Sequence, residues 1–183
     1  MFRTLSVFII TSVLFVLTAS AQMPDQQAAL QRAEMKKFEK MIGVWEGEGW
    51  VKEGPKTTYF RGMETVQWKV DGVAVLVEGL HKNKPAAGET EKVIHETLAV
   101  ISFDTKEKLF RFRTFLATGA QGSHEIKAVS ADTFEWGLGF PGGAGAFKYT
   151  IKMTDKTWFE IGEYTRDGKE WTKFFEMTLQ KRK

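Results

Sequence analysis

The chain has 183 residues and no cysteine, and its 26 Lys and Arg residues against 23 Asp and Glu residues give a formal net charge of +3. Without cysteine the protein can form no disulfide, thiolate nucleophile, iron–sulfur ligand set or covalent haem link. Basic residues are spread along the chain apart from the tail Lys181-Arg182-Lys183, whereas nucleic-acid binding is typical of a clustered basic face. We therefore expect no nucleic-acid partner.

Residues 1–21 are typical of a secretory signal peptide. Arg3 is the one charge before an apolar run, residues 5–17, that is too short to span a bilayer. Ala19-Ser20-Ala21 then supplies the small residues that a signal peptidase requires. We expect cleavage between Ala21 and Gln22, which makes the protein periplasmic or secreted and leaves residues 22–183 as a single domain without a membrane span. A retained membrane anchor is the alternative.

An amphipathic helix is predicted at about residues 25–42. Asp25 lies near its start, Lys36 and Lys40 lie near its end, and this order of charges suits the helix dipole. Gly43 supplies a C-terminal stop. A spacing of about 3.6 residues places apolar side chains on one face: Leu30, Ala33, Phe38, Met41 and Ile42. This face is expected to lie on the open end of the following domain or to mediate dimerisation, and the sequence does not separate the two.

From Val44 onward the hydrophobic pattern has a period of two residues, which is typical of β-strands. Short connections join most strands, so each is expected to pair with its neighbour in sequence. Such a meander has two exposed edges, and closing it into a barrel removes both. The sequence therefore predicts an all-β fold, an antiparallel up-and-down β-barrel of about ten strands with one N-terminal amphipathic helix. The predicted strands cover residues 44–51, 57–69, 73–81, 92–103, 109–116, 122–129, 133–140, 145–153, 157–164 and 171–180.

Two connections carry specific expectations. Asp71-Gly72 is predicted to form a two-residue hairpin turn of the kind that matches strand twist. Residues 82–91 are long and polar, which favours a mobile loop at the mouth of the barrel.

The start of the first predicted strand carries the most specific motif. The segment Gly43-Val44-Trp45-Glu46-Gly47-Glu48-Gly49 is similar to the Gly-x-Trp segment with which calycin-type barrels begin. Together with residues 93–100, 158–163 and 174–179, it resembles an uncharacterised bacterial family, the domain-of-unknown-function 1579 family, which is related to lipocalin-like barrels. The resemblance covers essentially all of residues 22–183. It implies a lipocalin- or fatty-acid-binding-like fold, and the family brings no established substrate or catalytic residue.

The residues of this motif, Gly43, Trp45, Gly47 and Gly49, are interpreted as structural. In calycins the tryptophan packs across the closed end of the barrel, often beneath a basic side chain from the end of the chain. The resemblance therefore implies that Arg182 stacks on Trp45 as a cation–π partner.

A more distant resemblance is to nitrobindin-like haem barrels, in which a histidine on the closing strand ligates the haem iron. The corresponding strand, residues 172–178, contains no histidine. A lone methionine such as Met177 is more often a core residue than an axial ligand. No haem or other cofactor is therefore predicted.

Ionisable residues embedded in the strands are the candidates for chemistry, and alternation assigns them to a face only in part. They are Glu46, Glu48, Glu64, Glu78, His95, Glu96, Arg111, Arg113, His124, Glu125, Glu135, Glu160, Glu163 and Glu176. If the aromatic faces point inward, Arg111, Arg113 and Glu135 lie outside in cross-strand ion pairs. If the strand of the arginines is reversed, both point into the lumen and bind a carboxylate or phosphate head group. The candidate lumen residues for ligand binding are His95, Arg111, Arg113, His124, Trp136 and Tyr149.

The three histidines, His81, His95 and His124, lie on three predicted strands and could converge on a metal. They lack the spacing of a metal motif, so no metal site is predicted. Nucleophile elbows, phosphate loops and dinucleotide fingerprints are absent from the sequence. Three functions stay open: a barrel that binds a small apolar or amphipathic ligand, a haem- or metal-dependent barrel enzyme, and a structural or partner-binding module with a filled barrel. The oligomeric state also stays open, with a dimer as one option.

Overall fold

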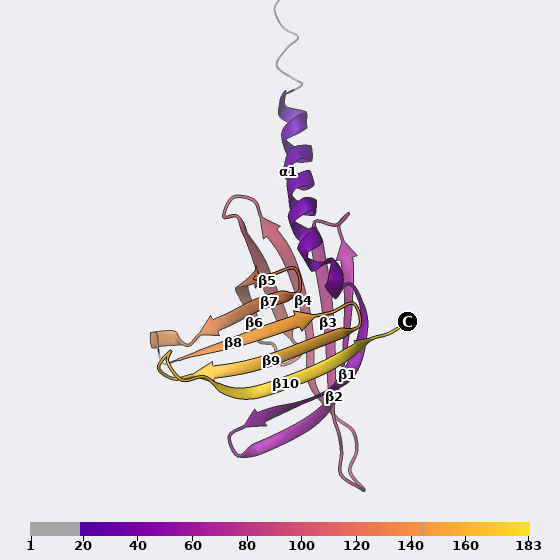
Figure 1. The fold of residues 1–183 in the computed structure, drawn as a ribbon, viewed down its shortest axis with the longest axis vertical. Coiled ribbons are helices and arrows are strands. Elements are labelled where there is room, and N and C mark those ends of the chain that lie inside the picture. The colour runs from indigo at the N-terminus through magenta and orange to yellow at the C-terminus, as the bar shows by residue number, and fades with distance from the viewer. Residues whose placement is uncertain (1–18, 144) are drawn as a thin grey trace, which may run out of the picture.

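The computed structural model describes residues 19–143 and 145–183, and its strands form one closed antiparallel barrel. Each strand pairs with its neighbours in sequence, and β1 pairs with β10 to close the sheet. The predicted all-β, up-and-down barrel is therefore confirmed. Its strands are β1 Gly43–Glu53, β2 Lys56–Lys69, β3 Ala74–Asn83, β4 Val93–Asp104, β5 Leu109–Leu116, β6 Gln121–Ala128, β7 Thr133–Gly139, β8 Ala146–Met153, β9 Thr157–Thr165 and β10 Thr172–Lys181. Figure 1 shows β8, β9 and β10 running across the direction of β2, β3 and β4.

Most of the predicted signal peptide, residues 1–18, lies outside the described residues, so its cleavage and the export of the protein stay predictions. Among the helices that the structure describes, none is long and apolar enough to cross a membrane.

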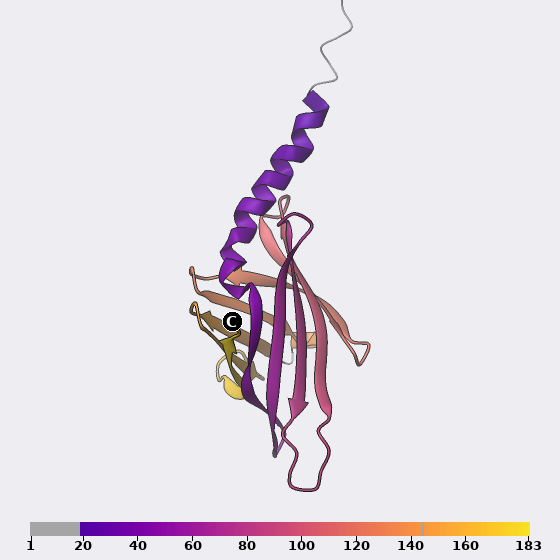
Figure 2. The ribbon, with the colours of Figure 1, turned by 90° about the vertical axis from the view of Figure 1, so that its right-hand side faces the viewer.

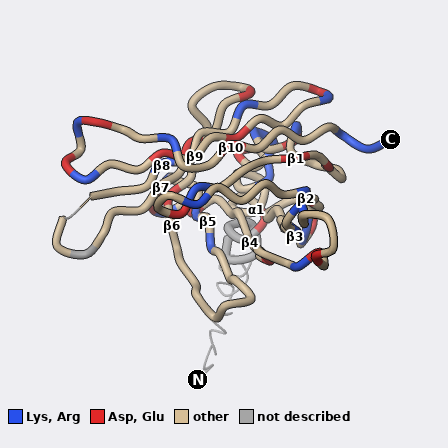
Figure 3. Tube along the Cα trace, turned by 90° about the horizontal axis from the view of Figure 1, so that it is seen from below, with Lys and Arg blue, Asp and Glu red and all other residues tan. Residues whose placement is uncertain are grey.

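Strand β2 shows how alternation encloses the interior. Phe60, Glu64 and Val66 are buried, while Arg61 and Gln67, on the opposite face of the strand, are exposed. The same period of two runs round the barrel, because successive side chains of a strand point to opposite faces of the sheet. Outside, basic and acidic residues are interspersed along the described chain (Figure 3). One face of each strand therefore borders a lumen, and the other carries the solvated charges.

The short 3-10 helix η1, Lys36–Met41, closes one end of the barrel. The ring of Phe38 is fully buried and lies 5.0 Å from the rings of both Phe110 and Phe134. Met41 is also buried and lines the lumen at this end of the barrel. The aromatic contacts fix η1 as a plug at this end.

The single helix predicted for residues 25–42 is divided in the structure into α1, Ala19–Met35, and η1. Leu30 is 47 % exposed, whereas Met35, which the sequence pattern left out, is fully buried. The reason is a change of period: Met35, Phe38 and Met41 are three residues apart, the spacing of a 3-10 helix, and a period of about 3.6 residues selects a different face. The prediction of the apolar face is therefore correct for Phe38 and Met41 and wrong for Leu30 and Ala33, which are both exposed.

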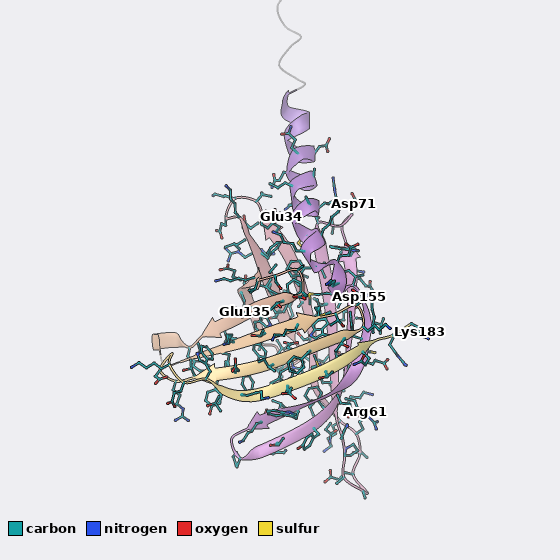
Figure 4. The ribbon with its side chains drawn as sticks, viewed as in Figure 1. Glu34, Arg61, Asp71, Glu135, Asp155 and Lys183 are labelled. Carbon is teal, nitrogen blue, oxygen red and sulfur yellow. The ribbon has the colours of Figure 1, made fainter. Side chains whose placement is uncertain are left out.

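Helix α1 extends beyond the plugged end and away from the barrel, and the loop of residues 84–92 lies at the opposite end (Figures 1 and 2). Gln31 Nε2 donates a hydrogen bond to the backbone oxygen of Phe103 at 3.1 Å, and Arg32 forms an ion pair with Asp71 at 3.0 Å. Figure 4 shows Asp71 beside α1. The helix therefore rests on two turns of the plugged end, and η1 rather than α1 covers the opening.

The hairpin between β2 and β3 is longer than the two-residue turn predicted at Asp71-Gly72. Lys69 pairs with Ala74, which leaves four residues in the connection. Val70, Asp71 and Gly72 all have positive φ, at 49°, 52° and 80°. The predicted position of the turn is correct, and its predicted length is wrong.

Trp45 is fully buried at the plugged end of the barrel. Its indole Nε1 donates a hydrogen bond of 2.7 Å to the backbone oxygen of Met41, and its ring centroid lies 6.1 Å from that of Trp158. The tryptophan of the Gly-x-Trp motif thus joins η1 to β1 and to Trp158 of β9, which lines the lumen.

The basic side chain over Trp45 is Lys181, whose Nζ lies 5.1 Å from the ring centroid. Arg182 instead forms an ion pair with Glu46, with 3.0 Å between Nε and Oε2. The expected stacking of Arg182 is therefore wrong. Lys181 is the cross-strand partner of Trp45, so both side chains stand on the same face of the sheet, and the next residue points to the other face.

The glycines of the motif lie where other chain segments come close. A Cβ at Gly47 would clash with the backbone of β10, and one at Gly49 would lie 2.5 Å from the ring of Phe60. Gly43 has a φ of 137°, and a Cβ there would lie 2.7 Å from Lys181 Cε. Their structural interpretation agrees with these close approaches.

Replacing Trp45 is expected to destabilise the barrel strongly. Trp45→Ala should lower the free energy of unfolding by about 3–5 kcal/mol, because it removes a buried indole and leaves a cavity. Chemical denaturation followed by circular dichroism measures this, with Trp171→Ala as control, since Trp171 is 37 % exposed. Equal stability of the two variants would contradict the structural role of Trp45.

Candidate functional site

The barrel encloses a cavity of about 510 Å³. Met41 lies at its plugged end, and Glu53, Ala120 and Gln121, beside the turns of the other end, also line it. The connection between β3 and β4, residues 84–92, lies at that same end, as predicted for a loop at the mouth. The cavity therefore runs from the η1 plug toward the mouth.

Strand β5 decides which predicted site residues face this cavity. Phe112 and Thr114 line it. Arg111 and Arg113 are on the opposite face, where Arg111 hydrogen-bonds to Glu107. The interpretation that turned both arginines into the lumen is therefore wrong, because the aromatic face of the strand is the one that points inward.

The other four candidate residues, His95, His124, Trp136 and Tyr149, line the cavity. The rings of Trp136 and Tyr149 stack with centroids 4.2 Å apart and 3° between their planes, and the His124 ring lies 5.6 Å from that of Trp136. His124, Trp136 and Tyr149 form one aromatic wall across β6, β7 and β8, whereas His95 lies on β4, with its ring 5.1 Å from that of His81. Their role in binding a ligand stays a prediction.

The sequence named Glu64, Glu160 and His81 among many ionisable residues but did not predict that they line the lumen, where they are its most deeply buried polar groups. Glu64 on β2 and His81 on β3 form a hydrogen bond of 2.9 Å between Oε1 and Nε2. Glu160 on β9 accepts a hydrogen bond of 3.1 Å on Oε2 from Trp158 Nε1. All three polar side chains are buried and line the cavity. For Glu64 a signal existed, because it shares its strand face with Phe60 and Val66.

Two glycines make room for the Glu64–His81 pair. A Cβ at Gly79 would lie 2.8 Å from Glu64 Oε2, and one at Gly62 would lie 3.2 Å from both the His81 ring and Met177 Sδ. The rings of His81 and Phe60 stack with centroids 4.7 Å apart. Glycines and aromatic stacking thus hold the pair in one position, although it lies within an otherwise apolar wall.

Burial makes these groups neutral near pH 7. It raises the pKa of Glu64 to about 8, and burial together with the negative charge of Glu64 raises the pKa of Glu160 to about 8. Burial also lowers the pKa of His81 to about 4, and burial and then the charge of His81 lower that of His95 to about 4. The proton of the Glu64–His81 pair therefore lies on the carboxyl, and the contact is a neutral O–H···N hydrogen bond rather than an ion pair.

The histidines do not gather around one point. The rings of His81 and His95 lie 5.1 Å apart, whereas His124 lies against Trp136. Within residues 19–143 and 145–183, no group of three or more His, Cys, Asp or Glu side chains is arranged to hold a metal ion. The absence of a cofactor stays a prediction.

No family model and no curated protein matches the chain. Solved structures with a similar fold include the following two. Rv2717c from M. tuberculosis aligns with a TM-score of 0.56 and 11 % identity over 81 % of this chain and 97 % of its own. The S-type phycobiliprotein lyase CPES from Guillardia theta aligns with a TM-score of 0.51 and 10 % identity over 85 % and 97 %. These likenesses show the fold alone, which is that of a calycin-like barrel.

The buried carboxyls make a specific prediction for the pH dependence of stability. Because burial raises the pKa of Glu64 and Glu160 above the ordinary value of 4.5 to about 8, the folded protein keeps protons that the unfolded chain releases. Stability therefore falls as pH rises between these values. Histidines with a lowered pKa oppose this trend only below their ordinary value of 6.5.

Between pH 6.5 and 8 the free energy of unfolding should thus fall by about 1 to 2 kcal/mol for each carboxyl. Glu160→Gln should remove about half of the total fall that Glu64 and Glu160 cause together. Glu163→Gln, on the outer face of the same strand, should leave the total fall unchanged. Urea denaturation at several pH values measures the slope. A slope that Glu160→Gln does not alter would show that this carboxyl is already ionised in the folded protein.

Proposed function

We propose that this protein is exported and binds a small apolar or amphipathic ligand in the lumen of its barrel. The observation that carries the proposal is the cavity of about 510 Å³, which lies within the range of about 300–1,000 Å³ for ligand pockets. Its wall is mainly aromatic and aliphatic, with few polar groups. A lumen filled by side chains would have favoured a structural module instead.

The lining suits an apolar ligand body. Phe112, Trp136 and Tyr149 present rings from three strands. Phe175 continues this row of rings, with its centroid 6.0 Å from that of Tyr149 and 5.8 Å from that of Phe60. Burying an apolar ligand against such a wall removes apolar surface of both from water, which stabilises the complex by about 25 cal/mol for each Å² buried. The aromatic wall therefore supplies the affinity, and the few polar groups supply orientation.

An enzyme that acts on such a ligand by acid–base chemistry is the second candidate. The observation in its favour is the position of Glu64, His81 and Glu160 on the cavity wall, with the pKa of both carboxyls raised by burial to about 8. Carboxyls perturbed in this way are common at catalytic sites. Recovery of a chemically altered ligand after incubation would support this candidate over a simple carrier.

Export and family membership belong to the same proposal. Support for export comes from the signal-peptide pattern of residues 1–21, and support for the domain-of-unknown-function 1579 family comes from the motif at Gly43–Gly49. The intact mass of the protein expressed as the full chain tests the first, since cleavage gives a chain that begins at Gln22. A chain that retains residues 1–21 would contradict it.

Native mass spectrometry of the mature protein, purified from its own host, tests the binding function. The native mass is expected to exceed the denatured mass by that of one small molecule, because the cavity holds a single ligand of this size. A bare polypeptide mass, together with no uptake of the neutral fluorescent probe N-phenyl-1-naphthylamine, would contradict the proposal.

A filled lumen should abolish binding. Ala99 is 2 % exposed and lines the cavity, whereas its neighbour Val100 points to the outer face of β4. Ala99→Phe should reduce the affinity for N-phenyl-1-naphthylamine at least about tenfold, at a stability cost of about 1–3 kcal/mol. The matched control Val100→Phe should bind the probe as the wild type does. Equal binding by both variants would place the probe outside the lumen.

A further inference from the structure

Among the described residues, acidic side chains line the cavity, but no lysine or arginine does. Two carboxyl side chains, Glu64 and Glu160, lie on its wall, and Glu53 lies at its mouth. Arg111 and Arg113 stand on the outer face of β5. A ligand that enters this lumen meets carboxyl groups and neutral imidazoles but no cation.

Resting on the proposed function, we infer that the ligand carries an uncharged head group, an alcohol or a carbonyl, and that this group is held between Glu160 and the Glu64–His81 pair. Fatty-acid-like anions are excluded as ligands, because two buried, hydrogen-bonded carboxyls lie on the wall and no lysine or arginine among the described residues lines it.

Glu160 provides the donor. Its Oε2 accepts the hydrogen bond from Trp158, and its Oε1 has no hydrogen-bond partner in the described protein. Every fully buried side-chain oxygen and nitrogen of the described residues has a hydrogen-bond partner. Because Oε1 has none, it is not fully buried, and it reaches the cavity that Glu160 lines. Burial raises the pKa of Glu160 to about 8, which leaves a proton on the free oxygen near pH 7. A protonated Oε1 at this position can donate a hydrogen bond to a group in the lumen.

Glu64 provides the acceptor. Its Oε1 is occupied by His81 Nε2 at 2.9 Å, and its Oε2 accepts no hydrogen bond from the residues that the structure describes. Both carboxyls line the same cavity. A Cβ at Gly62 would lie 3.2 Å from both the His81 ring and Met177 Sδ, and Met177 is the cross-strand partner of Glu160. A hydroxyl group accepts one hydrogen bond and donates another, so it matches the donor of Glu160 and the acceptor of Glu64. A carbonyl group satisfies the donor alone.

An anionic head group does not match this wall. A carboxylate has no proton to give Glu64, and it would lose its hydration without gaining a cation. A cationic ammonium would require at least one carboxyl to ionise, and it is therefore expected to bind better as the pH rises. The three charge classes thus differ in affinity and in pH dependence.

Competition against bound N-phenyl-1-naphthylamine at pH 7 tests the inference with three ligands of equal chain length: 1-decanol, decanoate and decylamine. Decanol is expected to displace the probe at a concentration at least about tenfold lower than decanoate or decylamine. Probe binding with equal or better displacement by decanoate or decylamine would overturn the inference and leave the proposed function standing. No probe binding would contradict the proposed function, and the inference with it.

Variants separate recognition from folding. Glu160→Leu should weaken decanol at least about tenfold, whereas Glu160→Gln, whose amide can still donate, should retain most of the affinity. The control Glu163→Gln, which loses an outer ion pair with Lys148, should leave it unchanged. Probe binding shows that each variant is folded. Unchanged decanol affinity in Glu160→Leu would overturn the assigned role.

The pH profile gives a second readout. The titratable groups that line the cavity are Glu64, His81, His95, His124, Tyr149 and Glu160 on the walls and Glu53 at the mouth. Near pH 8 only Glu64 and Glu160 titrate among the wall groups, since burial lowers the pKa of the histidines and raises that of Tyr149. Decanol affinity should fall between pH 7 and 9 in the wild type and fall less in Glu160→Gln. A flat wild-type profile would overturn the inference.

Discussion

The pairing of β1 with β10 is the constraint on which the rest of the structure depends. This ladder places Trp45 opposite Lys181 and Val51 opposite Phe175 and converts an open sheet into a barrel. Once the sheet is closed, alternate residues of every strand must share an enclosed space. Gly47 and Gly49 permit the approach of β10 and of the Phe60 ring. The cavity, its aromatic wall and its buried carboxyls all follow from this closure.

The strands were predictable because alternation is a local property. Each predicted strand agrees with the observed one to within a few residues, and Phe110 and Phe112 already indicated the inner face of β5. The features that the sequence missed depend on contacts between distant segments. Lys181 rather than Arg182 covers Trp45 because of register, and Met35 is buried because the helix changes period as it enters the barrel. Neither register nor that change of period can be seen in a hydrophobic pattern.

The polar part of the site was harder to predict than its aromatic part. Alternation placed Glu64 on an apolar strand face, yet charged residues are seldom buried without a partner, and its partner His81 lies on another strand. Burying both groups in neutral form avoids the cost of an ion in an apolar lumen. The glycines at positions 62 and 79 make room for the pair, so backbone, packing and protonation act together. The wall of the lumen is therefore mostly apolar, and its buried Glu64, His81 and Glu160 side chains are uncharged near pH 7.

A crystal structure of the mature protein grown with 1-decanol would show whether the lumen binds an uncharged amphipathic ligand. Electron density is expected for one molecule in the lumen, with its alkyl chain against the aromatic wall of Trp136 and Tyr149 and its oxygen within hydrogen-bond distance of Glu160. A lumen filled by its own side chains, or a molecule bound only on the outer surface, would contradict binding in the barrel.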